Sequence, residues 1–209
     1  MDNVLLIGDS IRLGYEKAVK SSLAHVANVI SPAENCRFSS YVLRYLHEYR
    51  GLAKGEPIKV VHWNAGLWDC LRMFGDPPLT PLSFYAYYID SICHRIKKLF
   101  PDAVVIFATS TSVITERMSD DFKRYNKEIE SYNECASDIA KSFGFIVNDL
   151  YSLSLTLPES AHSDGVHYNT PEGTKALASQ VNAYIASALG ITEEIPYKED
   201  LFTDAPSGI

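Results

Sequence analysis

The sequence predicts an α/β fold, a three-layer α/β/α sandwich with a five-stranded parallel sheet. Three observations lead to this prediction. Short apolar runs rich in β-branched and aromatic residues recur along the chain, and helix-length stretches lie between them. The 209 residues, 46% of them hydrophobic, are also enough to bury one substantial core. Alternating strands and helices form βαβ units with right-handed crossovers, so the strands are parallel and helices cover both faces.

Five segments are expected to form the strands. The first, VLLIG at 4–8, is a short apolar run ended by glycine, which is typical of a buried parallel strand that opens into a turn. Similar runs occupy 59–66, 103–111 and 145–150, and a weaker one occupies 25–30. Ligands bind at the carboxyl ends of the strands in such sheets, so residues that follow these runs are the first candidates for a site.

Helices are expected over 12–23, 39–50, 83–100, 120–143 and 171–189. In the third of these, isoleucines and a leucine recur at spacings of three and four, as one face of a helix packed on a sheet requires. Before the last, Thr170 supplies a cap and Pro171 takes the first helical position. Strand and helix signals therefore alternate from end to end.

The expected domain covers residues 1–190, and residues 191–209 form a C-terminal tail. This tail is acidic and carries two prolines, and the sequence leaves open whether it wraps the domain or extends freely. The segment 74–81 holds three prolines and a glycine, which predicts a surface loop that could border a pocket.

The charge of the chain restricts its partners. A net charge of −7, with no basic run longer than Lys97-Lys98, argues against binding nucleic acid or an anionic membrane. No apolar run approaches the roughly 20 residues that span a bilayer. The N-terminal stretch lacks the basic region and cleavage site of a secretory signal, so a cytoplasmic location is expected. The four cysteines form no C-x-x-C pair, and no metal or organic cofactor is expected.

Ser10 follows the first strand directly and stands just before a helix. A serine in this place is exposed to a cleft, and the helix amides near residues 11–13 provide partial positive charge where an oxyanion forms. The alternative is that Asp9 or Ser10 only caps the first helix. Taken alone, this short motif leaves both interpretations open.

Asp164 lies three residues before His167, on the segment that precedes the last helix. An aspartate at this spacing can direct its carboxylate to Nδ1 of the imidazole and leave Nε2 free to accept a hydroxyl proton. The alternative is an ordinary loop in which Asp164 stabilises a turn. A nucleophile after the first strand and an acid-base pair before the final helix can meet at one sheet edge, so together the two features predict a Ser-His-Asp triad.

At these residues the chain resembles a known family. The GDS motif at 8–10 with Gly14 resembles the first block of the SGNH/GDSL hydrolases, and Asp164-x-x-His167 resembles their last block. The resemblance extends over residues 4–189. It implies a serine nucleophile, an Asp and a His from one loop, and a sheet of five parallel strands. It also implies an oxyanion hole built from the backbone amide of the serine, a second backbone amide and an asparagine side chain.

The third block departs from the family pattern of Gly-x-Asn-Asp. The corresponding stretch, 66–69, has Trp68 where the family has asparagine. Asn64, near the end of the same strand, is predicted to supply the oxyanion amide instead; the alternative is that it satisfies the turn. Trp68 is expected to stack on a sugar ring at the cleft edge or, alternatively, to belong to the core.

The second block falls within 31–40. Where the family has a glycine that donates its amide, this chain has Cys36, and its backbone amide is predicted to complete the hole with that of Ser10. Arg37 is expected to contact an acidic or hydroxylated group of the substrate, unless it is simply solvated. Asp9 is counted with the substrate-binding residues. His162, two residues before Asp164, is the alternative to His167 as the general base.

The resemblance implies two-step acyl transfer without a cofactor. Short-chain esters, acetyl esters of carbohydrates first, are the expected substrates, whether small molecules or glycans. The alternatives are a non-catalytic carbohydrate-binding protein of the same fold, or a lysophospholipase or thioesterase. A phosphate-binding enzyme is disfavoured because the first turn lacks G-x-G-x-x-G and G-K-[ST].

Overall fold

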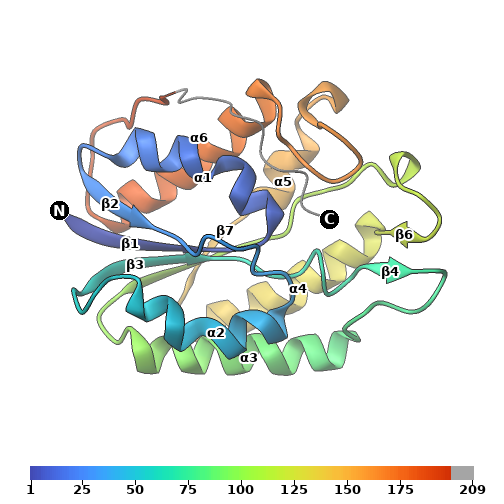
Figure 1. The fold of residues 1–209 in the computed structure, drawn as a ribbon, viewed down its shortest axis with the longest axis horizontal. Coiled ribbons are helices and arrows are strands. Elements are labelled where there is room, and N and C mark those ends of the chain that lie inside the picture. The colour runs from blue at the N-terminus through green and yellow to red at the C-terminus, as the bar shows by residue number, and fades with distance from the viewer. Residues whose placement is uncertain (199–209) are drawn as a thin grey trace.

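The computed structural model describes residues 1–198 and contains a five-stranded parallel sheet between two layers of helices (Figure 1). The sheet has the order β2-β1-β3-β5-β7. Its strands are β1 (Asp2–Ile7), β2 (Ala27–Ile30), β3 (Ile58–Trp63), β5 (Val104–Ala108) and β7 (Ile146–Asn148). All of its neighbouring pairs are parallel, and each strand lies within a predicted segment or overlaps one.

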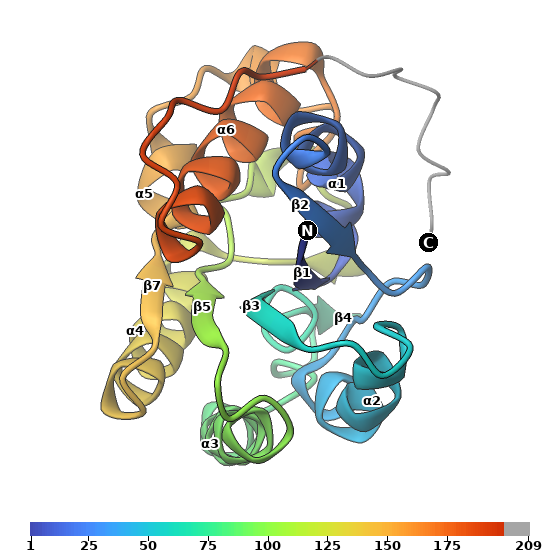
Figure 2. The ribbon, with the colours of Figure 1, turned by 90° about the vertical axis from the view of Figure 1, so that its left-hand side faces the viewer.

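The helices divide evenly between the two faces of the sheet (Figure 2). One face carries α1 (Ser10–Leu23), α5 (Leu150–Leu155) and α6 (Pro171–Ala188), and the other carries α2 (Ser39–Gly51), α3 (Leu82–Leu99) and α4 (Asn126–Ser142). In α3, Ile89, Ile92 and Ile96 are fully buried, as the spacing of its apolar residues predicted. The three-layer sandwich is therefore confirmed.

The connections reverse direction between β1 and β3. From β1 the chain crosses to β2 on one side, and later it continues through β3, β5 and β7 on the other. Ile7 is paired with Trp63, and the Asn64 amide donates to the Ile7 carbonyl at 3.1 Å. The residues that follow these two strands consequently leave the sheet side by side, at the switch point where α/β sheets bind their ligands.

The helix predicted over 120–143 is wrong at its start, because α4 begins only at Asn126. The preceding residues include β6 (Phe122–Lys123), which pairs antiparallel with β4 (Arg72–Met73). The Asn126 side chain holds the backbone of Val113 by two hydrogen bonds of 2.9 Å, which fixes the start of α4. Two short 3₁₀ turns, Thr115–Arg117 and Glu159–Ala161, were also not predicted.

The described part of the tail lies on the domain. Ile195 and Tyr197 pack against the core, and the Lys198 amide donates to Ser22 Oγ in α1 at 3.0 Å. Residues 199–209, the rest of the predicted tail, lie outside the described residues. Within residues 1–198, no helix has the length and apolar character needed to cross a membrane.

Candidate active site

Ser10, His167 and Asp164 form a continuous series of hydrogen bonds. His167 Nε2 lies 2.9 Å from Ser10 Oγ, and His167 Nδ1 lies 2.7 Å from Asp164 Oδ2. An ionised carboxylate only accepts hydrogen bonds, so Nδ1 carries the ring proton and Nε2 is the acceptor that faces the serine. The side chains of His167 and Asp164 are 25% and 54% exposed, so solvent reaches the series mainly at its aspartate end.

The turn between β1 and α1 presents Ser10. Asp9 is the N-cap of α1, and its Oδ1 accepts the Ile11 amide at 3.0 Å. Ser10 is the first residue of the helix, where a backbone N–H has no intrahelical acceptor and faces outward. Its amide is therefore suited to the oxyanion role predicted for it.

Asp9 does not occupy the substrate-binding position that the sequence suggested. It is only 1% exposed, and its carboxylate is engaged in capping the helix. Burial raises the pKa of this carboxyl, against the lowering effect of the Ile11 amide. A side chain covered in this way has no free surface for a substrate, so Asp9 supports the turn that presents Ser10.

The loop between α5 and α6 orients Asp164 toward the ring. Its Oδ1 accepts the amides of Val166 and His167 at 2.6 and 2.8 Å, while Oδ2 faces Nδ1 of His167. Burial works to raise the pKa of Asp164, but the His167 ring and the two amides outweigh it and hold the pKa well below its usual value. The carboxylate therefore stays ionised beside the imidazole.

Close backbone packing holds this loop in place. The Gly165 carbonyl accepts the Ile114 amide at 2.8 Å, and a Cβ on Gly165 would lie only 2.9 Å from Met118 Cγ. On the other side, a Cβ on Gly14 would lie 2.3 Å from Asn169 Oδ1. Gly14 in α1 thus lets the histidine loop approach the nucleophile helix, which gives this glycine of the GDS block a physical role.

Tyr168 anchors the same loop in the core. It is 2% exposed, and its hydroxyl donates to the Ser112 carbonyl at 3.1 Å and lies 2.9 Å from Ser112 Oγ. The ring of the rival base His162 lies tilted against that of Tyr168, with centroids 4.0 Å apart, and the hydrogen bond to Ser10 comes from His167. The structure therefore favours His167 over His162 as the partner of the serine.

Asn64 lies beside the nucleophile turn, as the oxyanion prediction requires. It is 5% exposed, and a Cβ built on Gly8 would lie 2.0 Å from its Oδ1. The glycine before Asp9 therefore leaves the space that the Asn64 amide occupies. Trp68, at the position where the family has asparagine, is half-buried and makes an edge contact with Phe38, with centroids 5.5 Å apart.

The prediction for Cys36 is wrong in its geometry. The Cys36 amide donates to the Gly8 carbonyl at 3.1 Å, so this N–H is already used to join the β2–α2 connection to the nucleophile turn. The residue is also fully buried. Its neighbour Arg37 is exposed, adopts a left-handed backbone with φ of 44°, and has its guanidinium 5.9 Å from the Tyr41 ring. The Arg37 side chain is therefore accessible to solvent.

Two buried arginines were not predicted. Arg12 is fully buried and its contacts are described below. Arg124 is 3% exposed; its Nε donates to the Leu67 carbonyl on the connection after β3, and its guanidinium lies 5.2 Å from the Phe122 ring. No signal in the sequence separates these two from solvated arginines. Within residues 1–198, no three His, Cys, Asp or Glu side chains gather as a metal site would need.

No family model matches the sequence, and no curated protein matches it. Solved structures do resemble the fold. The lipase/acylhydrolase from Enterococcus faecalis superposes with a TM-score of 0.70 at 19% identity, over 90% of this chain and 96% of the other. A GDSL-like lipase from Bacteroides thetaiotaomicron VPI-5482 gives 0.70 at 18% identity, over 90% and 89% of the two chains.

An acetyl xylan esterase from Geobacillus stearothermophilus gives a TM-score of 0.67 at 17% identity, over 91% of this chain and 95% of the other. The likeness therefore extends over most of this chain and of each of the others. The chain therefore has the fold of the SGNH/GDSL hydrolases.

Proposed function

We propose that this protein is a serine esterase that hydrolyses short acyl esters, acetyl esters of carbohydrates first, through a Ser10 acyl-enzyme. The observation that supports the proposal is the hydrogen-bonded series from Asp164 through His167 to Ser10, with distances of 2.7 and 2.9 Å. Nucleophile, base and orienting carboxylate within hydrogen-bond reach are the requirements of a hydroxyl nucleophile at neutral pH.

In the first half-reaction His167 Nε2 takes the Ser10 hydroxyl proton as Oγ attacks the ester carbonyl carbon. The carbonyl π electrons move to oxygen, and their return expels the alkoxide, which takes the proton from His167. In the second, His167 removes a proton from water, the hydroxide attacks the acyl carbon, and Ser10 leaves with the proton. Asp164 stabilises the imidazolium in both halves. This chemistry needs no metal ion or organic cofactor.

The oxyanion is assigned two donors, the Ser10 amide and the Asn64 side chain. Ser10 stands at the N-terminus of the 14-residue helix α1, where the helix dipole adds partial positive charge. Asn64 follows β3 and lies against Gly8. Donors fixed in a largely buried position stabilise a developing negative charge better than water does, because they need no reorganisation during the reaction.

Three residues, Trp68, Phe38 and Arg37, support the proposed substrate class. Trp68 and Phe38 place two aromatic rings in edge contact beside the loop that carries Asn64. Aromatic faces at a cleft edge suit the apolar faces of sugar rings, and the exposed Arg37 nearby offers hydrogen bonds to hydroxyl or carboxylate groups. One of the structures with this fold is an acetyl xylan esterase, which agrees with an acetylated glycan as substrate.

The test is hydrolysis of p-nitrophenyl acetate, butyrate and octanoate by the wild type and by Ser10→Ala, followed by acetate release from an acetylated xylan oligosaccharide. Rapid hydrolysis of the acetate ester that Ser10→Ala abolishes is the expected result. Octanoate cleaved faster than acetate would overturn the short-acyl assignment. Equal activity in the wild type and Ser10→Ala would overturn the serine mechanism.

A further inference from the structure

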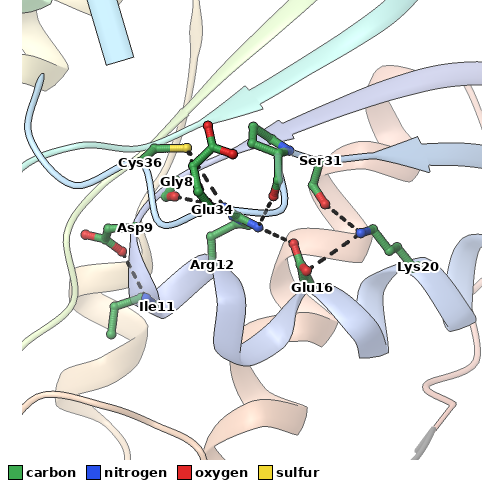
Figure 3. A network of polar contacts seen from close by, with 10 residues as sticks. Gly8, Asp9, Ile11, Arg12, Glu16, Lys20, Ser31, Glu34 and Cys36 are labelled. Carbon is green, nitrogen blue, oxygen red and sulfur yellow. Dashed lines mark hydrogen bonds and ion pairs between the residues drawn. The ribbon is translucent and has the colours of Figure 1, made fainter. Parts of the chain in front are cut away.

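Arg12 is a fully buried arginine two residues after Ser10 (Figure 3). Its guanidinium donates to three backbone carbonyls: Nη2 to Gly8 at 3.2 Å and Glu34 at 2.6 Å, and Nη1 to Pro32 at 3.0 Å. Gly8 belongs to the nucleophile turn, and the other two belong to the β2–α2 connection. One side chain thus joins the segment that presents Ser10 to the neighbouring loop.

Four of the six residues in the loop at 31–36 contact Arg12 or Lys20 of α1: Ser31, Pro32, Glu34 and Cys36. Lys20 Nζ holds Ser31 Oγ at 2.5 Å at the entrance of the loop, and Arg12 holds the carbonyls within it. At its end, the Cys36 amide bonds the same Gly8 carbonyl that Arg12 contacts, and Cys36 Sγ lies 3.9 Å from Arg12 Nη2. Figure 3 shows Arg12 with its partners in the loop, and Glu16 and Lys20 farther along the helix.

The charge of Arg12 is balanced within α1. Nη1 pairs with Glu16, one turn later, and Glu16 lies 3.7 Å from Lys20 Nζ. A buried guanidinium without a carboxylate is costly, and here the partner comes from the same helix and not from a substrate. Arg12 therefore has its forked donors directed at backbone carbonyls, which is a geometric task that a lysine cannot perform.

We infer that Arg12 is a positioning residue for the Ser10 nucleophile: it fixes the Gly8 carbonyl and the 31–36 loop as one rigid unit with α1. This inference rests on the proposed function for its catalytic consequence. Gly8 stands two residues before Ser10, and its α-carbon lies against Asn64, so movement of this residue displaces both the nucleophile and the oxyanion donor. A displacement of about 1 Å at such groups lowers turnover about 100-fold.

The first arm of the test needs no enzymatic activity. Native Arg12→Lys and wild-type protein are treated with N-ethylmaleimide, and labelling of Cys36 and of Cys93 is followed by peptide mass spectrometry. Both thiols are fully buried, and Cys93 lies in α3, on the opposite face of the sheet from Arg12. Labelling of Cys36 is expected to accelerate at least about tenfold, as for loss of a hydrogen bond to a charged group, while Cys93 is unchanged.

The second arm measures p-nitrophenyl acetate hydrolysis per folded molecule. Arg12→Lys is expected to lower kcat about 100-fold with little change in KM, because Trp68 and Arg37 at the rim are not held by Arg12. The control is Ile96→Ala, a fully buried substitution in α3, assayed at a temperature where both variants are folded. Ile96→Ala is expected to keep the wild-type kcat.

A graded variant covers the case in which Arg12→Lys does not fold. Lys20→Ala removes the contact at Ser31 and the ion pair with Glu16 but leaves Arg12 in place, and it is made at a side chain that is 37% exposed. It should accelerate Cys36 labelling to a smaller extent than Arg12→Lys. Equal acceleration at Cys36 and Cys93 in either variant, or an unchanged kcat in folded Arg12→Lys, overturns the inference. An inactive wild type overturns the proposed function alone, because the labelling arm still reports on Arg12.

Discussion

Gly8 and Asn64 touch so closely that the glycine has no room for a side chain. A Cβ on Gly8 would lie 2.0 Å from Asn64 Oδ1 and 2.7 Å from Arg12 Cβ. The nucleophile turn is therefore enclosed by the oxyanion candidate on one side and by a buried arginine on the other. Gly8 is the point at which β1, β3 and α1 meet.

Gly8→Ala is expected to destabilise the protein by about 1–3 kcal/mol, as overpacking of a tight site does, and to abolish esterase activity. Thermal unfolding and p-nitrophenyl acetate assays measure the two effects. Gly51→Ala is the matched control, since a Cβ there meets no atom within 4 Å. It should leave activity intact and raise stability by up to about 1 kcal/mol. Equal unfolding temperatures for the two variants would contradict this account of Gly8.

Asn64→Ala is expected to reduce kcat about 100- to 1,000-fold with a small change in KM, because an oxyanion donor acts mainly in the transition state. Steady-state kinetics with p-nitrophenyl acetate measure this. Trp68→Ala serves as the comparison. It should raise KM for an acetylated oligosaccharide while leaving kcat for the small ester nearly unchanged. A wild-type kcat in Asn64→Ala would remove Asn64 from the oxyanion hole.

Asp164→Asn is expected to lower kcat about 1,000- to 10,000-fold, because an amide no longer favours the ring tautomer with the proton on Nδ1. The side chain also accepts the Val166 and His167 amides, so Asp164→Ala should be less stable than Asp164→Asn. Kinetics and thermal unfolding of the pair separate the two roles. His162→Gln should retain activity, and its inactivation would make His162 a candidate for the base.

His62 gives the stability a pH dependence. It is buried in β3, its Nε2 lies 3.1 Å from Asn148 Nδ2, and burial lowers its pKa from 6.5 to about 3. Between these values the unfolded chain binds a proton that the folded protein does not, so the His62 contribution to stability falls as the pH decreases from 6.5 toward 3. The limiting slope is about 1.4 kcal/mol per pH unit.

Asp69 has the opposite effect on the pH dependence of stability, between pH 6 and pH 3.8. Burial raises its pKa to about 6 despite hydrogen bonds from Ser39, so the folded protein binds a proton there more readily than the unfolded chain. Its contribution to stability therefore rises as the pH decreases from 6 to 3.8. His62→Gln, which keeps an acceptor for Asn148, should lose less stability than the wild type on acidification. Urea unfolding at pH 7, 5.5 and 4.5 measures the difference, and parallel curves for the two proteins would exclude His62 as the cause.

The sequence was sufficient to predict the sheet and to select the residues of the candidate site, because strand and helix patterns depend on short-range periodicity. Ser10 after the first strand and His167 before the last helix both follow from such local signals. The start of α4 could not be predicted from local signals, because the Asn126 side chain is held by the backbone of Val113, a contact that no local pattern reveals. The antiparallel pairing of β4 with β6 depends on the same kind of long-range contact.

Backbone hydrogen bonding limited the prediction of the oxyanion hole. The sequence places Cys36 in the correct loop, but the acceptor of its amide is Gly8, 28 residues earlier, and only the folded chain brings them together. The burial of Asp9 and Arg12 could not be predicted for a similar reason. The sequence around a serine motif does not indicate whether a neighbouring charged residue is buried. Burial of charge is decided by tertiary contacts.

Ser10 begins α1, His167 lies four residues before α6, and these two helices pack against each other on one face of the sheet. The 2.9 Å separation of Oγ and Nε2 is thus a property of helix docking as much as of the loops that carry the two residues. On the proposed mechanism, any mutation, additive or temperature change that lets α1 and α6 slide lowers turnover before unfolding is detected by spectroscopy. The proposed esterase activity would therefore report on the packing of α1 against α6.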